Sequence, residues 1–165
     1  MSSSDAGLHY AFRQAHAAEN KLVAELLDLA TQHSTDHEVH HVARDLAAWS
    51  RENLRKLAKV AAEHELQLDA EADQPGRLRH LPEAIATLIG RRPEPGLLLL
   101  EKLREIYLLA STASLAWEML AQHAQAKQET DILELTDQCH PQVLRQIRWA
   151  NTMIKALSPQ VLTSL

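Results

Sequence analysis

The hydrophobic positions of this chain recur at alternating steps of three and four residues along four long stretches. This spacing places them on one face of an α-helix and is typical of helices that pack into a bundle. It predicts helices at about 5–32, 37–65, 97–126 and 129–157. The third stretch contains no proline or glycine and is apolar or small almost all round at its middle. We therefore expect the other helices to enclose it.

Each predicted helix has one row of positions that should face the core. In the first helix this row has one charged member, Glu19, and reads Leu8, Phe12, Ala15, Glu19, Leu22, Leu26 and Leu29. The second row reads Val39, Val42, Leu46, Trp49 or Ser50, Asn53, Leu57 and Val60. The third reads Leu99, Leu103, Ile106, Ala110, Ala113, Trp117, Leu120 and Ala124. The fourth reads Ile132, Thr136, Cys139, Val143, Ile147, Ala150, Ile154 and Leu157.

The connections between these helices differ greatly in length. A short polar turn, with Thr35 or Asp36 as helix cap, makes the first two helices an antiparallel hairpin. Residues 66–94 form a long crossover, rich in proline and glycine, with a small helix expected at 82–89. A connection of that length suits a chain that must span a bundle from end to end. Pro141 should kink the fourth helix, and Ser158-Pro159 should end it.

Composition narrows the class of protein. The 165 residues are 45% apolar and 24% charged, which favours a single globular domain over residues 1–165. A net charge of −5 argues against nucleic acid as a partner. We expect no membrane span and no secretion signal. The single cysteine, Cys139, fits a cytoplasmic location.

Three segments carry a resemblance to a known family: LAAWSREN at 46–53, REIYLLASTASLAWEML at 104–120 and CHPQVLRQIRWANTMIKALSPQVL at 139–162. With them the chain resembles the ferritin-like family that includes the YciF-type proteins, and looks most like uncharacterised actinobacterial proteins of the same texture. The resemblance implies an all-α, ferritin-like four-helix bundle with a long crossover between the second and third helices. It also implies an inward metal site, with a glutamate from the first and third helices and Glu-x-x-His from the second and fourth.

Only part of that ligand set is present here. Glu19 matches the glutamate of the first helix, but Ser50 and Asn53 stand where the second helix would supply its pair. The third helix offers Glu105, one step off its inward row, and the fourth offers Asp137 and His140. A dinuclear iron site needs more carboxylates than these. The candidate metal ligands are therefore Glu19, Glu105, Asp137 and His140, and any cofactor would be a transition metal ion.

Glu19 is the sharpest single feature, because a carboxylate in a core row is costly unless it is paired or protonated. We expect a polar core layer made of Glu19, Asn53, Tyr107 and His140. Such a layer is either a reduced metal or ligand site or a structural hydrogen bond. A rotation of the first helix that brings Glu19 to solvent is the third interpretation.

Three other groups of residues suggest chemistry less strongly. His37, His40 and His41, near His33, have the helical spacing of a surface zinc or nickel site, but a solvated helix start explains them as well. Cys139 lies beside His140, yet its place on the apolar row favours a buried core thiol. Trp49, Trp117 and Trp149 are expected to serve core or subunit packing. No catalytic sequence motif identifies the chain as an enzyme.

Together these features predict a ferritin-like protein with a degenerate metal site and a role in binding or assembly, for example as a homodimer. The first alternative is a metal-binding protein that uses a reduced site around Glu19 for redox or metal handling. The second is a helical bundle that binds a small ligand with Glu19 as its polar anchor.

Overall fold

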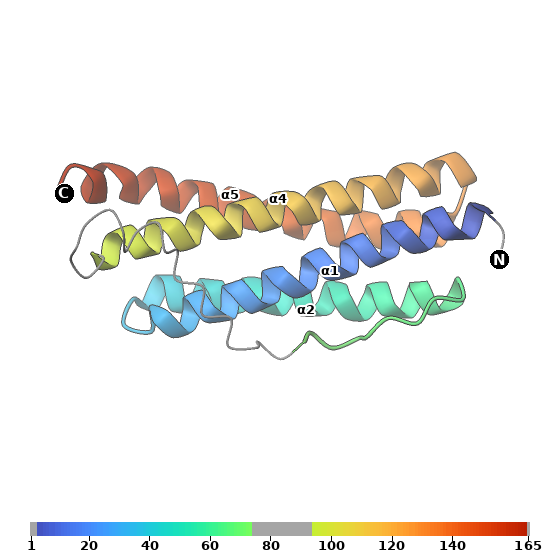
Figure 1. Ribbon diagram of the computed structural model, residues 1–165, viewed down its shortest axis with the longest axis horizontal. Helices are drawn as coiled ribbons and strands as arrows, with labels where there is room; N and C mark the ends of the chain where they lie inside the picture. Colours follow the sequence, from blue (N-terminus) through green and yellow to red (C-terminus); the bar gives the residue numbers. More distant parts are fainter. Residues whose placement is uncertain (1–2, 74–93, 165) are drawn as a thin grey trace.

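The chain forms an all-α four-helix bundle (Figure 1), as predicted. The computed structural model describes residues 3–73 and 94–164. Its helices are α1 (Ser3–Gln32), α2 (His37–Glu63), α4 (Pro95–Lys127) and α5 (Thr130–Leu162). Each is long because its stretch is continuous in the three-four pattern, which gives it a buried face to pack.

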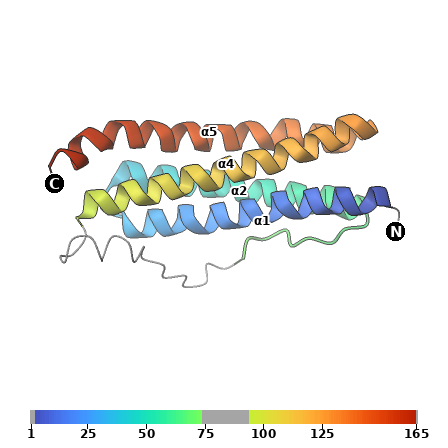
Figure 2. The same cartoon turned by 45° about the horizontal axis from the view of Figure 1, so that its top comes forward.

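The helices form two hairpins, α1–α2 and α4–α5, that pack side by side. α1 contacts α2 and α4, while α5 contacts α4 and α2, so that α2 and α4 lie on one diagonal of the bundle. Figures 1 and 2 show that α2 and α4 run in the same direction and that α1 and α5 run against them. The end of α2 and the start of α4 therefore lie at opposite ends of the bundle, as the length of the connection between them predicted.

The first part of this connection, residues 64–73, lies along α1 and is called the strap below (Figure 2). The ring nitrogens Nε2 of His9 and His16 are 2.8 Å from the carbonyl oxygens of His64 and Asp69, respectively. Within the strap, the side chain of Leu66 is buried in the hydrophobic core. The rest of the predicted crossover, including the small helix expected at 82–89, lies outside the described residues.

The predicted inward rows are confirmed for the first and third helices, whose members are all buried. In α2 and α5 most of the predicted row is buried as well. The exceptions are partly exposed residues that pack against the edge of the core: Val42, Trp49, Val60, Ile147, Ile154 and Leu157.

One predicted helix end was wrong, that of α5, while the end of α2 lies two residues before the predicted position. α2 ends at Glu63 because Glu65 adopts a left-handed φ of 60° and the amide of Leu66 turns back to the carbonyl of Ala61 at 2.9 Å. α5 continues past Pro159 to Leu162 instead of ending at 157. Packing explains this extension: Val161 is buried against Gly96, where an added Cβ would meet a methyl group of Val161 at 2.8 Å. The remaining ends differ from the prediction by two residues or fewer.

Candidate functional site

Glu19 lies at the middle of α1 with its side chain fully buried, as its place in the inward row predicted. Its Oε1 accepts two hydrogen bonds, from Asn53 Nδ2 at 2.8 Å and from Trp117 Nε1 at 2.7 Å. These donors come from α2 and α4, the two helices that α1 contacts. One carboxyl oxygen therefore ties three helices together.

A second set of hydrogen bonds extends this layer to the fourth helix. Gln146 of α5 is fully buried, and its Nε2 donates to Ser50 Oγ and to the carbonyl of Leu46, each at 2.9 Å. Ser50 lies one turn before Asn53 on α2, so both sets meet on the same face of that helix. We call Glu19, Ser50, Asn53, Trp117 and Gln146 the polar core layer.

The surroundings of Glu19 disfavour its charged form. Burial raises the pKa of Glu19 above its ordinary value of 4.5, and the neighbouring polar side chains of Ser50, Trp117 and Asn53 oppose that rise without cancelling it. Oε1 accepts both N–H groups as a carbonyl oxygen would, while Oε2 receives no hydrogen bond from the described residues. A proton on Oε2 gives this atom a donor, and lowers the cost of burying it.

Buried acceptors for that proton exist within the same layer. The amide oxygens of Asn53 and Gln146 are buried and receive no hydrogen bond from the described residues. Asn53 donates to Glu19 Oε1 at 2.8 Å, so its amide group lies beside the carboxyl group. Burial thus shifts the pKa of Glu19 in the direction that favours its protonated form.

The structure joins Glu19 to Asn53 but places the other expected members of the layer elsewhere. Tyr107 is partly buried at the edge of the core. His140 is partly exposed: its Nε2 is 2.8 Å from Ser114 Oγ, and its Nδ1 is 3.9 Å from a carboxyl oxygen of Glu118. No described contact links Tyr107 or His140 to Glu19. Trp117, Ser50 and Gln146 complete the layer instead.

The remaining candidate metal ligands lie on the surface, apart from Glu19. Asp137 is exposed on α5, in a cleft that it shares with His140 and Glu118. Glu105 is half exposed and pairs with Lys102. Among residues 3–73 and 94–164 no group of three or more His, Cys, Asp or Glu side chains is arranged to hold a metal ion. The residues proposed for a reduced metal site thus do not converge.

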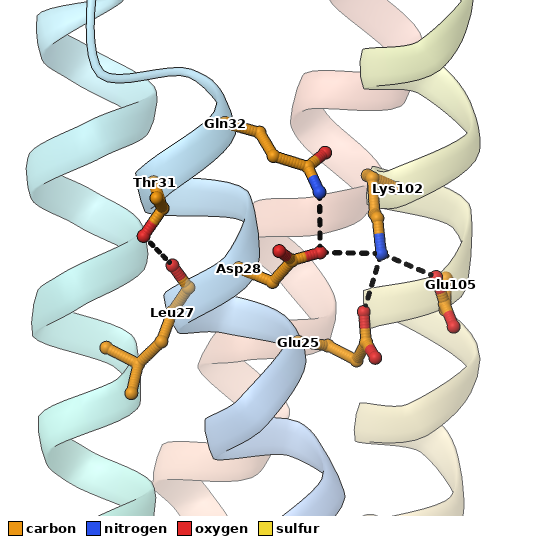
Figure 3. Close-up of polar contacts among 7 residues, drawn as sticks. All are labelled: Glu25, Leu27, Asp28, Thr31, Gln32, Lys102 and Glu105. Carbon is orange, nitrogen blue, oxygen red and sulfur yellow. Dashed lines mark hydrogen bonds and ion pairs between the residues drawn. The ribbon is translucent and has the colours of Figure 1, made fainter. Parts of the chain in front are cut away.

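Glu105 belongs to an ion-pair cluster between α1 and α4, shown in Figure 3. The ammonium of Lys102 lies 2.8 Å from Glu25, 3.0 Å from Asp28 and 3.4 Å from Glu105. Burial alone would lower the pKa of Lys102, but the hydrogen bonds to Glu25 and Asp28 outweigh this effect and raise it. Gln32 donates to Asp28 at 2.8 Å and closes the cluster. Three carboxylates thus share one partly buried cation.

The histidines at the α1–α2 turn pack on one another. The rings of His37 and His41 stack with centroids 6.0 Å apart, and His41 meets His40 edge-on at 5.1 Å. Nδ1 of His40 is 2.7 Å from the carbonyl oxygen of Ala30, which places a donor on the last turn of α1. The ring of His40 is therefore a hydrogen-bond partner for the C-terminal end of α1. Burial lowers the pKa of the neighbouring His33, which favours the neutral form of that side chain.

Cys139 is fully buried in the core cluster. Burial raises the pKa of its thiol to about 12, and the thiolate needed for nucleophilic chemistry is correspondingly scarce at neutral pH. The environment matches the core thiol expected from the sequence.

The expected layer lacked three members of the observed one: Ser50, which the sequence placed on the inward row of α2 as an alternative to Trp49, and Gln146 and Trp117, each of which left a signal. The buried positions of α5 run Thr136, Cys139, Val143, Gln146 and Ala150, a strict three-four series. The expectation of Ile147 followed hydrophobicity and departed from this series by one residue. Trp117 was predicted as core packing, but a buried indole N–H usually has an acceptor, and Glu19 is the acceptor that it meets.

Comparisons of the chain with protein-family models, with curated proteins and with solved structures gave no match. In the part of the chain that the structure describes, no helix has the length and apolar character needed to cross a membrane.

Proposed function

We propose that this protein is a ferritin-like scaffold that acts by binding or assembly and that hydrogen bonds have replaced the metal site at its centre. The observation that supports this proposal best is the surroundings of Glu19. Both acceptor positions of Oε1 are taken by neutral N–H donors, from Asn53 and Trp117. An N–H group aimed at a carboxylate oxygen occupies the place where a cation would bind.

The other members of the polar core layer also support a centre held by hydrogen bonds in place of a metal site. The oxygens left without donors belong to Glu19 itself and to the amides of Asn53 and Gln146. Amide oxygens are weak ligands for transition metals, which favour imidazole, thiolate and several carboxylates. Glu105, Asp137 and His140, which the metal-binding alternative requires, lie in two separate surface clusters. A neutral hydrogen-bonded layer is the arrangement that these residues fit.

Such a layer suits a structural role. Burying polar groups gives little net stability, but it penalises every helix register that leaves them unpaired. Here one register of all four helices pairs Glu19, Asn53, Trp117, Ser50 and Gln146 together. The layer would thus hold the four long helices in a single alignment and leave the outer faces of the bundle free for binding.

Elemental analysis of untagged protein, purified without chelator, tests the proposal. The wild type is compared with Glu19→Gln, which keeps the side-chain shape, and with a His37→Ala/His41→Ala double variant. We expect less than a tenth of an equivalent of iron, manganese or zinc, or metal that is retained in Glu19→Gln and lost from the histidine variant. A near-stoichiometric metal that disappears in Glu19→Gln, with helix content unchanged by circular dichroism, would contradict the proposal.

A further inference from the structure

The outer face of α4 carries a stripe of large apolar side chains. Leu108, Leu115 and Met119 are exposed to 51%, 67% and 45%, respectively. Their spacing of seven and four residues puts them in one line along the helix. The inward row of α4 is already fully used by the core. The stripe is therefore a second apolar face, on the opposite side of the same helix.

A cleft of about 230 Å³ lies between α4 and α5 and includes Glu118, the residue before Met119 at one end of this stripe. Glu118 and Gln122 line it from α4, while Pro141 and Leu144 line it from α5. Leu144 is itself 44% exposed. Elsewhere in the described chain the large exposed apolar residues, Tyr10 and Leu162, lie apart on other helix ends. Scattered residues of that kind need no partner, whereas exposed apolar residues aligned on one face of a helix favour one.

We propose that a second copy of this chain covers the stripe, with the two α4 helices packed antiparallel about a two-fold axis between Ser111 and Thr112. This inference rests on the assembly role proposed above and names its partner. In that register Leu108 of each copy lies opposite Leu115 of the other. A two-fold interface repeats each contact twice, so a stripe that is complementary to itself is sufficient.

The charges at the ends of the stripe support the same register. The two-fold axis places Arg104 of one copy opposite Met119 of the other, one residue from Glu118. Both charged side chains reach the surface: that of Arg104 is 67% exposed, and that of Glu118, which accepts a hydrogen bond from Gln122 on its own helix at 2.9 Å, is 52% exposed. Within the chain Arg104 meets only Glu101 among the described residues, at 3.5 Å, and such an exposed pair on one helix is weak. The dimer would thus have two Leu108–Leu115 pairs that flank Ser111 and Thr112 at its centre, and an Arg104–Glu118 pair at each end, an arrangement that favours this antiparallel register over parallel pairing.

Sedimentation equilibrium of the full chain tests the dimer. We expect the wild type to be a dimer. Leu115→Glu should raise the dissociation constant by about 100-fold or more, because the substitution removes two leucines, one from each copy, from an apolar interface. The matched control is Leu162→Glu, which changes an exposed leucine at the far end of α5 and should leave the dimer intact. A monomeric wild type at 100 μM, or a dimer that Leu115→Glu does not weaken, would overturn the proposal.

A charge exchange tests the register and the identity of the partner. Arg104→Glu should weaken the dimer at low salt, because it sets two acidic residues against each other. The double variant Arg104→Glu/Glu118→Arg should restore wild-type affinity, which happens only if the two positions meet between copies. Weakening without restoration would overturn the antiparallel register. None of these residues belongs to the polar core layer, so the metal analysis above fails or succeeds independently of this result.

Discussion

The indole nitrogen of Trp117 donates to the carboxyl oxygen Oε1 of Glu19 at 2.7 Å. Trp117 is the largest fully buried side chain in the described chain, and Glu19 is the buried carboxyl group there. The bond crosses from α4 to α1 at the centre of the bundle. A tryptophan expected only to pack in the core and a potential metal ligand are therefore joined by a hydrogen bond. This hydrogen bond supports the proposal that the protein is a scaffold.

Removing the indole N–H should destabilise the fold. Trp117→Phe deprives Glu19 of a donor and leaves a small cavity, so we expect a loss of about 1.5–3 kcal/mol in the free energy of unfolding. Trp149→Phe is the matched control, since the Trp149 indole nitrogen has no hydrogen-bond acceptor among the described residues. Chemical denaturation measures both.

The loss of stability in Trp117→Phe includes the effect of the lost hydrogen bond and the effect of the cavity. A double-mutant cycle separates the two. In a Glu19→Ala background the acceptor is gone, and Trp117→Phe should cost less there by about 1 kcal/mol. Equal costs in the two backgrounds would show that Trp117 acts by packing alone.

Stability should depend on pH through Glu19, in a direction that its raised pKa sets. Below the unfolded-state pKa near 4.5 the group is protonated in both states, and its contribution to stability is fully present. As pH rises toward the folded-state pKa the unfolded chain loses its proton while the folded chain keeps it, so stability falls by about 1.4 kcal/mol per pH unit from this group. Glu19→Gln removes this dependence.

The measurement is the difference in unfolding free energy between Glu19→Gln and the wild type across pH 4 to 8. We expect the variant to gain relative stability as pH rises above 4.5. Comparing two proteins cancels the titration of the other groups, which both share. A difference that stays flat with pH would mean that Glu19 has the same pKa in the folded and unfolded chains.

Much of this layer was predictable from the sequence. The three-four rows placed Glu19 and Asn53 inward because a helix's own periodicity decides which side chains share a face. The same rule, applied strictly, places Gln146 inward on α5. The bond between Glu19 and Trp117 was not predictable in this way, because it depends on how α1 and α4 align along their axes. That alignment is set by packing between helices, which no spacing within a helix records.

The position of the strap was likewise not predictable from the spacing of residues within one helix. His9 and His16 lie seven residues apart on one face of α1, which the sequence makes plain. Their partners are backbone carbonyls of residues 64 and 69, more than fifty positions away. The position of that segment depends on where α2 ends, and the left-handed residue Glu65 ended it earlier than hydrophobic spacing indicated.

Lys102 should be needed to hold α1 against α4. Lys102→Ala leaves Glu25, Asp28 and Glu105 facing one another without a cation, and we expect a loss of about 1–3 kcal/mol in the free energy of unfolding. The loss should shrink in high salt, because screening weakens the repulsion of partly exposed carboxylates. Lys59→Ala, an exposed lysine on α2, serves as control and should change stability little. A loss independent of salt would mean that the aliphatic stem of Lys102, rather than its charge, matters.

Cys139 should be unreactive in the folded protein. Burial and a pKa of about 12 leave little thiolate at pH 8, so a thiol reagent should label the native chain at least about 100-fold more slowly than the denatured chain. Leu162→Cys provides the matched control, with a second thiol at an exposed position. Rapid native labelling at two thiols in that variant, and at one in the wild type, would contradict the buried position of Cys139.

The most direct test of the scaffold is the stability of Glu19→Gln at pH 7, measured by chemical denaturation with and without added zinc, manganese or ferrous iron. Glutamine keeps the oxygen that accepts from Asn53 and Trp117, and it adds an N–H₂ donor where the carboxylic acid holds its proton. The account predicts a variant at least as stable as the wild type, with no difference between the two proteins in their response to metal. A wild type that metal stabilises by more than about 1.4 kcal/mol over Glu19→Gln, a tenfold effect, would contradict it and restore Glu19 as a metal ligand.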